Sequence, residues 1–152
     1  MNGEVIEDVD RFVYSGANIS EEIKRRIQLA TGVYGDLKTI WKDNNIKLDI
    51  KVPLLRTCVF SVLLYAVETW AINKTDEKRI LAFENRCYRW LLRIKWKDHV
   101  TNKEVHEQIG RPVSLITIIK YRKLELFGHV TRMHDGQHAL LSHVQTASFS
   151  RI

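Results

Sequence analysis

Proline, glycine and cysteine are scarce in this chain. Its 152 residues hold two prolines, seven glycines and two cysteines. So few chain-breaking residues disfavour a many-stranded sandwich, which needs frequent turns, and favour long helices. The cysteines, Cys58 and Cys87, both fall inside apolar helical patterns. We therefore expect buried free thiols and a reducing, intracellular compartment, with nuclear or cytoplasmic placement left open.

Long hydrophobic runs are also missing. The most apolar run, Cys58 to Val67, spans ten residues and contains Ser61, so it is too short to cross a bilayer. Met1 to Asp10 is acidic rather than basic and then apolar, so we expect no signal peptide and no membrane partner. Hydrophobic residues still make up 45% of the chain, enough for the core of one domain.

Motifs that carry catalysis are absent as well. There is no Gly-rich phosphate loop, nucleophile elbow or CxxC pair, and the close acidic pairs Glu21-Glu22 and Asp76-Glu77 stand at predicted helix starts. Four histidines recur at spacings of five, four and five residues: His129, His134, His138 and His143. No cysteine or adjacent glutamate completes a metal set there. The sequence predicts no enzyme, no cofactor, no metal site and no small-molecule substrate.

Acidic residues are concentrated at the start of the chain. The formal net charge is +6, but residues 1–10 hold four acids and no Lys or Arg. Residues 11–152 therefore contain 24 basic and 14 acidic residues, a net charge of +10. This excess favours a polyanionic partner, nucleic acid first and an acidic membrane surface second. A soluble protein with a high isoelectric point and no such partner is the alternative.

Local patterns predict a β-hairpin followed by two helices. Phe12–Tyr14 and Ala17–Ile19 are β-prone and flank Ser15-Gly16, which suits a tight hairpin turn. Ser20 is expected to cap a helix with apolar residues on one face. These residues are Ile23, Ile27, Ala30, Tyr34, Leu37 and Trp41. The next helix is expected from Val52 to Glu68, with Pro53 in its first turn.

Three further helices are expected in the second half of the chain. Thr75 and Asp76 offer caps for a helix with one apolar stripe, formed by Ile80, Phe83, Cys87, Leu91 and Ile94. A capping box, Thr101-Asn-Lys-Glu104, opens a short helix ending near Gly110, and the last helix spans roughly Ser114 to Met133.

The fold class predicted from these elements is mostly α. About five helices should pack as a small bundle with one short N-terminal β-hairpin. We expect an acidic leader at residues 1–10, a helical domain at 11–136 and a loosely ordered tail at 137–152.

A basic stretch is the strongest local feature. Residues 78–97 hold seven Lys or Arg against one acid, Glu84, with Tyr88, Trp90 and Trp96 between them. Cations at helical spacing can bind successive phosphates, and an exposed ring can stack on a base. A solvated face beside buried tryptophans is the alternative. The predicted nucleic-acid-binding residues are Arg86, Arg89, Arg93, Lys95 and Lys97, with smaller clusters at Lys24, Arg25 and Arg26 and at Lys120, Arg122 and Lys123.

Several strings, taken in order, identify a resemblance. They are Phe12-Val-Tyr-Ser-Gly-Ala-Asn-Ile-Ser20, Ile23-Lys-Arg-Arg-Ile27, Leu37-Lys-Thr-Ile-Trp-Lys42, Leu54-Leu-Arg-Thr-Cys-Val-Phe60, Leu64-Tyr-Ala-Val-Glu-Thr-Trp70, Cys87-Tyr-Arg-Trp-Leu-Leu-Arg-Ile94 and Tyr121-Arg-Lys-Leu-Glu-Leu-Phe-Gly-His-Val-Thr-Arg-Met133. Together they resemble the C-terminal portion of the endonuclease–reverse transcriptase of non-LTR (LINE-like) retrotransposons. The resemblance covers roughly residues 11–136.

The resemblance implies a division of labour. In the family the hairpin acts as a primer grip, and the following helices form a thumb that clamps the template–primer duplex. Carried over, Phe12, Tyr14 and Gly16 would belong to the grip, and Lys24, Arg25 and Arg26 to the thumb. The implied partners are an RNA–DNA hybrid or duplex and, in association, a full-length reverse transcriptase.

The departures from the family pattern limit what carries over. The catalytic Tyr-x-Asp-Asp motif should precede the hairpin, but residues 1–10 contain no Asp-Asp pair, and residues 1–10 would be the end of a missing palm. Ser61 and Ala66 stand where the family pattern has Pro and Gly. We therefore expect a non-catalytic fragment that binds nucleic acid. An inert structural remnant and a protein–protein module that pairs with a full-length relative are the alternatives.

Overall fold

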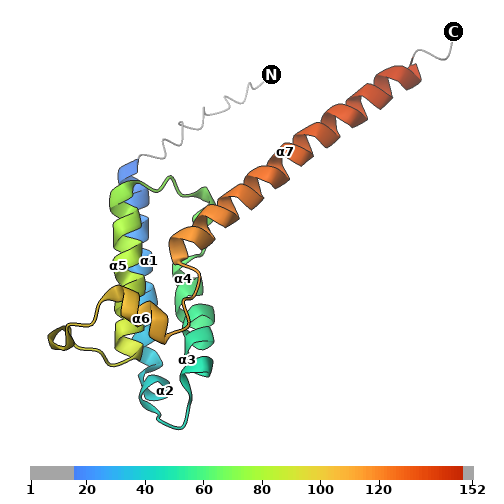
Figure 1. Cartoon of the computed structure of the whole chain (residues 1–152). Helices are drawn as coiled ribbons and strands as arrows, with labels where there is room; N and C mark the ends of the chain where they lie inside the picture. Colours follow the sequence, from blue (N-terminus) through green and yellow to red (C-terminus); the bar gives the residue numbers. More distant parts are fainter. Residues whose placement is uncertain (1–15, 149–152) are drawn as a thin grey trace, which may run out of the picture.

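The structure is a computed structural model that describes the backbone of residues 16–148 and the side chains of residues 19–95 and 97–132. Helices and their connecting loops account for this whole range, and none of the described residues forms a strand. The predicted mostly α fold is confirmed. In Figure 1, α1 (Gly16–Asp36) and α5 (Lys74–Leu91) stand side by side in the body of the molecule, and α7 (Leu115–Ser148) projects away from it.

The chain enters the body through α1, and the predicted hairpin is wrong where the structure describes it. Gly16–Ser20, including the expected strand Ala17–Ile19, is the start of α1. Ile19 and Ile23 are both buried, and their spacing of four places them on one helix face, so core packing overrides the local β propensity. The other expected strand, Phe12–Tyr14, lies outside the described residues. Because α1 begins at Gly16, Ser20 lies inside this helix and is not its N-cap.

The predicted apolar face of α1 is confirmed. Ile23 and Ala30 are fully buried, and Ile27 and Tyr34 pack against the core. A short helix, α2 (Lys38–Lys42), follows α1 and buries Trp41. The buried Lys51 satisfies the carbonyls at the end of α2, because its Nζ donates to Trp41 O at 3.0 Å and to Asp43 O at 2.6 Å.

The single helix predicted from Val52 to Glu68 is instead a broken series. It begins earlier, as α3 (Leu48–Leu54), widens into a π-helical segment, η1 (Leu55–Phe60), and returns to α4 (Ser61–Leu63). Pro53 lies inside α3 rather than in its first turn, and its missing N–H removes one rung of the ladder immediately before η1. The series ends where Ala66 adopts a left-handed φ of 56°, before the 3₁₀ turn η2 (Val67–Thr69).

The next helix, α5, has the predicted core stripe but a different cap. Ile80, Phe83, Cys87 and Leu91 are buried, and burial raises the pKa of the Cys87 thiol to about 12. The N-cap is Asn73, whose side chain accepts from Asp76 N at 2.8 Å, so Thr75 and Asp76 lie within the first turn.

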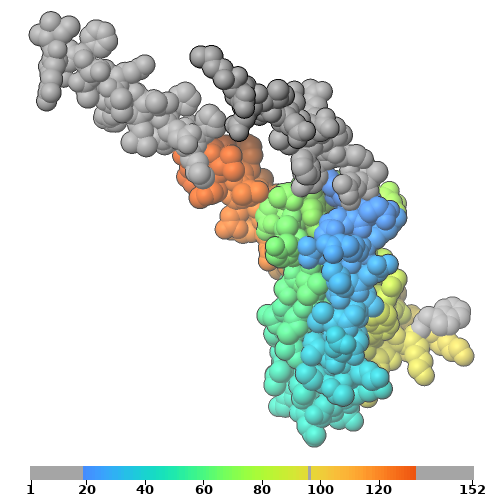
Figure 2. Space-filling model, turned by 180° about the vertical axis from the view of Figure 1, so that it is seen from behind, coloured from blue at the N-terminus to red at the C-terminus, as the bar shows by residue number. Residues whose placement is uncertain are grey.

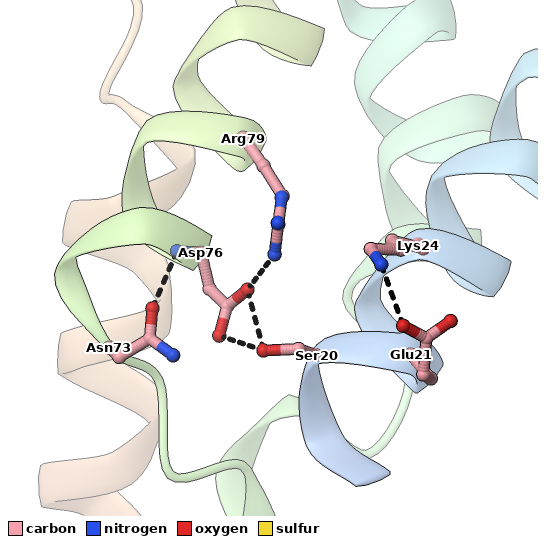
Figure 3. Close-up of polar contacts among 6 residues, drawn as sticks. All are labelled: Ser20, Glu21, Lys24, Asn73, Asp76 and Arg79. Atoms are coloured by element: carbon pink, nitrogen blue, oxygen red, sulfur yellow. Dashed lines mark hydrogen bonds and ion pairs between the residues drawn. The ribbon is translucent and has the colours of Figure 1, made fainter. Parts of the chain in front are cut away.

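The buried Asp76 ties the starts of α5 and α1 together. Its carboxylate accepts from Ser20 Oγ at 2.8 Å and from Arg79 Nη1 at 2.8 Å (Figure 3). The last residues of α1 contact α5 as well, through Tyr34 and Trp90. The two helices therefore run parallel, and the ends of both lie together.

Beyond α5 the chain makes a 3₁₀ turn, η3 (Trp96–Asp98), and enters α6 (Asn102–Gln108). Figure 2 shows the segment after α5, in yellow, projecting beside α1 and α2, in blue and cyan. The predicted capping box is confirmed, because Glu104 N donates to Thr101 Oγ1 and Thr101 N donates to Glu104 Oε2. Gly110, with φ of 82°, ends α6 as predicted.

The last helix, α7, begins at Leu115, near the predicted start. It continues to Ser148, so the predicted end near Met133 is wrong. The looseness predicted for residues 137–152 stays a prediction. Leu115 and Ile119 are buried at the start of α7, whereas five large apolar side chains beyond them are exposed: Tyr121, Leu124, Leu126, Phe127 and Val130. Within the described residues, no helix is long and apolar enough to cross a membrane.

Candidate nucleic-acid interface

Three aromatic rings contact one another where the ends of α1, α2 and α5 meet. The Tyr34 and Trp41 rings are nearly parallel, with centroids 5.2 Å apart and 21° between their planes. Tyr34 also contacts Trp90, with centroids 5.1 Å apart and 47° between the planes. Trp41 Nε1 donates to Tyr34 O at 2.8 Å, which fixes the indole. Trp41 is buried but Trp90 is 40% exposed, so this stack ends in an accessible ring.

Cations surround the accessible end of the stack. A surface hollow of about 360 Å³ is lined by Tyr34, Lys38, Trp41, Lys42, Arg89, Trp90, Arg93, Ile94 and Lys95. Among the described residues, the ammonium groups of Lys38, Lys42 and Lys95 have no hydrogen-bond or ion-pair partner, and all three residues are exposed. They are therefore free to contact an anionic ligand.

A second hollow adjoins the first and shares Trp90, Arg89 and Ile94 with it. This hollow, of about 400 Å³, is also lined by Ala82, Asn85, Arg86 and Asn102. The Arg86 guanidinium lies 5.9 Å from the centroid of the Trp90 ring. We call the set Tyr34, Lys38, Lys42, Arg86, Trp90 and Lys95 the aromatic–cationic surface.

Among the described residues, neither hollow is lined by an Asp or Glu. The Asp98 carboxylate accepts from the backbone N of Lys95 at 2.6 Å and not from its ammonium group. The acid of the basic stretch, Glu84, is buried on another face of α5, where Leu115 N donates to both carboxylate oxygens at 3.2 Å. Desolvation raises the pKa of Glu84, and the Leu115 N–H and the charge of Arg56 partly oppose that rise. Glu84 therefore caps α7 and leaves the cations of the surface unneutralised.

Two of the predicted arginines have structural roles beside the surface. Arg89 Nη1 donates to Val100 O at 2.8 Å, and Arg93 Nη2 donates to Lys42 O at 2.7 Å. Arg93 also has a left-handed φ of 57° and ends α5, with Ile94 N donating to Arg89 O at 2.9 Å. Replacing either arginine would disturb the loops around the hollows as well as their charge.

The predicted cluster at Lys24, Arg25 and Arg26 lies near the other end of α1. Lys24 Nζ contacts Glu21 Oε1 at 2.6 Å (Figure 3), and both arginines contact the Glu22 carboxylate at 2.8 Å. These pairs hold the pKa of Glu22 at about 2. With its charge locally matched, this cluster is a weaker anion site than the aromatic–cationic surface.

The cluster on α7 binds the body of the protein. Arg122 Nη1 donates to Leu64 O at 3.1 Å, and Lys123 Nζ donates to Trp70 O. Lys120 Nζ lies 3.7 Å from a Glu77 carboxylate oxygen. These contacts attach α7 to the turn after α4, to Trp70 directly after η2, and to α5.

The remaining predicted residues are placed as follows. Lys97 is exposed in η3 and lines neither hollow. Gly16 is the first residue of α1, whereas Phe12 and Tyr14 of the expected primer grip lie outside the described residues. Of the aromatic residues in the basic stretch, Tyr88 is fully buried, so its ring is not accessible for stacking on a base. The Trp96 side chain lies outside the described residues.

Sequence reasoning missed Lys38 and Lys42 as site residues and assigned Tyr34 and Trp41 to the core alone. The available signal was the order Tyr34, Lys38, Trp41, Lys42, in which cations and rings recur at spacings of three and four, as along one helix side. The signal was hidden because α2 is separated from α5 by more than thirty residues of sequence, and only the fold brings them together.

The described side chains hold no group of three or more His, Cys, Asp or Glu that could bind a metal ion. No family model matches this chain, and neither a curated protein nor a solved structure matches it significantly. Its relation to retrotransposon reverse transcriptases therefore stays a prediction from the resemblance.

Proposed function

We propose that this protein binds nucleic acid without sequence preference through the aromatic–cationic surface. One observation carries the proposal. Lys38, Lys42, Arg86 and Lys95 gather around an exposed tryptophan, and among the described residues none of their side-chain cations has a hydrogen-bond or ion-pair partner. Phosphates bind such cations by displacing counterions, and rings accept any base, so affinity without base readout follows.

The resemblance to the thumb-like portion of LINE-like reverse transcriptases supports the same class of ligand. In that family, the thumb contacts the sugar–phosphate backbone of the template–primer, which is an RNA–DNA hybrid or duplex. The proposed role is contact rather than chemistry, since this sequence contains no Tyr-x-Asp-Asp motif. A full-length reverse transcriptase is the proposed source of catalysis where the two associate.

The test is fluorescence-anisotropy binding to an RNA–DNA hybrid at several salt concentrations. We expect affinity to fall steeply as salt rises. In the variant Lys38→Gln, Lys42→Gln, Lys95→Gln, the affinity at low salt should drop at least tenfold. The slope of log K against log salt should lose about two to three units, because each lost phosphate contact removes roughly 0.7 to 0.9. These lysines are chosen over Arg89 and Arg93 because the lysine ammonium groups make no hydrogen bond among the described residues, whereas both guanidinium groups do.

A matched control removes the same charge elsewhere. Lys24→Gln, Lys74→Gln, Lys78→Gln neutralises three exposed lysines nearer the beginnings of α1 and α5. It should keep most of the affinity and of the salt slope. Equal losses of affinity in both variants would mean that binding depends on the overall charge of the protein and not on this site. Absence of binding at low salt, with cooperative unfolding intact, would refute the proposal and leave an inert remnant.

A second candidate function is protein–protein association through α7. The exposed side chains of Leu124, Phe127 and Val130 recur every three residues and form an apolar stripe along a helix that leaves the body of the molecule (Figure 1). The mass of the protein in solution tests this function without nucleic acid.

A further inference from the structure

Core packing does not account for the exposure of Trp90. Its neighbour Tyr88 is fully buried, and the Tyr88 hydroxyl accepts a hydrogen bond from Arg56 Nη1 at 2.9 Å. Trp90 packs on Tyr34 yet leaves 40% of its surface exposed, on a wall shared by two hollows. A large ring that ends an aromatic stack and faces open hollows is suited to stack on a further planar group.

We propose that the aromatic–cationic surface binds a single-stranded segment of nucleic acid, with one unpaired base stacked on Trp90. This inference rests on the proposed nucleic-acid binding and specifies the form of the ligand. Lys38, Lys42 and Lys95 contact the phosphates on the α2 side of the base. Arg86 contacts a phosphate on the α6 side, across the Trp90 wall.

The geometry selects an unpaired base over a duplex. In a duplex each base face is covered by its stacked neighbours, so a protein ring reaches only a base that has left the stack. The cations line hollows on either flank of one ring rather than a long straight row, which suits a strand that bends around a stacked base. Every base has a π-face, so the stacking adds affinity without sequence preference.

Arg86 is free to make room for the base. Its guanidinium lies 5.9 Å from the Trp90 centroid, near the outer limit of about 6 Å for a cation–π contact. Arg86 is exposed and has no hydrogen bond or ion pair among the described residues. Moving it from the ring to a phosphate therefore breaks one weak contact and forms a charge-assisted hydrogen bond.

The test compares two fluorescein-labelled strands of about 12 nucleotides, within the span that such surfaces cover. One is oligothymidylate, and the other is an abasic strand with the same phosphates and no bases. Wild-type protein should bind oligothymidylate roughly 5- to 150-fold more tightly, the range expected for stacking one base. Both strands should show the same salt slope, because the phosphates are the same.

Variants assign the difference to one ring. Trp90→Leu should bring the oligothymidylate affinity down to that of the abasic strand and keep the salt slope, whereas Trp90→Phe should keep part of the preference. The control Tyr121→Leu removes an exposed ring on α7 and should keep the full preference for oligothymidylate over the abasic strand. Circular dichroism and thermal unfolding verify that each variant is folded.

The outcomes separate this inference from the proposed function. Binding of both strands with equal affinity and a steep salt slope would overturn base stacking while the nucleic-acid site stands. Absence of binding to both strands and to the RNA–DNA hybrid would overturn both. A preference for oligothymidylate that survives in Trp90→Leu would place the stacked base elsewhere and overturn the assignment to Trp90.

Discussion

Within residues 16–148, four residues other than glycine adopt positive φ: Ala66, Arg93, His99 and Arg111, with φ of 56°, 57°, 49° and 51°. The left-handed region costs an L-residue about 1–2 kcal/mol, so the surrounding structure must impose it. At Arg93 the gain is visible, because this residue ends α5 and its side chain binds Lys42 O. At Ala66 the side chain is exposed and offers no comparable contact.

Ala66 is therefore the position where one substitution should stabilise the protein. Ala66→Gly relieves the left-handed strain and loses only about 0.5–1 kcal/mol of backbone entropy, so we expect a net gain of roughly 0.5–1 kcal/mol. Urea unfolding measures the difference in free energy. The control Ala82→Gly changes an exposed residue within α5 and should instead lower stability by about 1 kcal/mol. A loss of stability in both variants would contradict the strain at Ala66.

At the scale of elements, α5 holds α7 through one buried carboxylate. Glu84 accepts from Leu115 N at the first residue of α7, and desolvation raises the pKa of Glu84 above its ordinary value of 4.5. A carboxyl whose pKa is higher in the folded than in the unfolded state binds more protons when folded. Stability should therefore fall as pH rises from about 4.5 through the folded pKa of Glu84.

Thermal unfolding as a function of pH tests this link. Above pH 4.5 the melting temperature of the wild type should decline as pH rises, and Glu84→Gln should remove that decline while its amide oxygen still accepts from Leu115 N. Glu22, whose pKa is lowered to about 2, acts with the opposite sign and below pH 4.5, so the two windows do not overlap. Parallel profiles for wild type and variant above pH 4.5 would exclude Glu84 as the source.

The elements that sequence predicted well are those fixed by neighbours along the chain. The Thr101–Glu104 capping box, the end of α6 at Gly110 and the stripe from Ile80 to Leu91 depend on contacts three to seven residues apart. The start of α1 was missed because distant packing decides it, and the π-helical segment was missed because Pro53 was expected in a first turn rather than inside a helix. Ile19 enters the core as part of a helix, and the chain after Pro53 changes its hydrogen-bond register.

The candidate site was predictable only in part for the same reason. Arg86 and Lys95 were found from local charge, and the structure leaves them exposed and available. Arg89 and Arg93 look equivalent to Arg86 in sequence, but their shortest hydrogen bonds go to the backbone carbonyls of Val100 and Lys42. Backbone acceptors have no sequence signature, so only the fold distinguishes an arginine that supports a loop from one that faces a ligand.

At the scale of the whole molecule, charge and apolar surface lie on different parts. The aromatic–cationic surface lies where α1, α2 and α5 end. The apolar stripe lies on α7, the helix that projects from the body (Figure 1). Beside that stripe, Lys120, Arg122 and Arg132 outnumber Glu125. Two copies that paired through α7 would bring like charges together, and salt would screen their repulsion.

Salt should therefore act in opposite directions on the two candidate functions. Light scattering coupled to size-exclusion chromatography should give a mass above the 17.8 kDa of one chain, increasing with ionic strength, if α7 self-associates. Leu124→Ser with Phe127→Ser should restore the monomer, whereas the control Ile50→Ser with Val113→Ser changes two equally apolar exposed residues elsewhere and should not. A monomer at all salt concentrations would exclude self-association, and nucleic-acid binding, which salt weakens, would remain the function to which the exposed surface is suited.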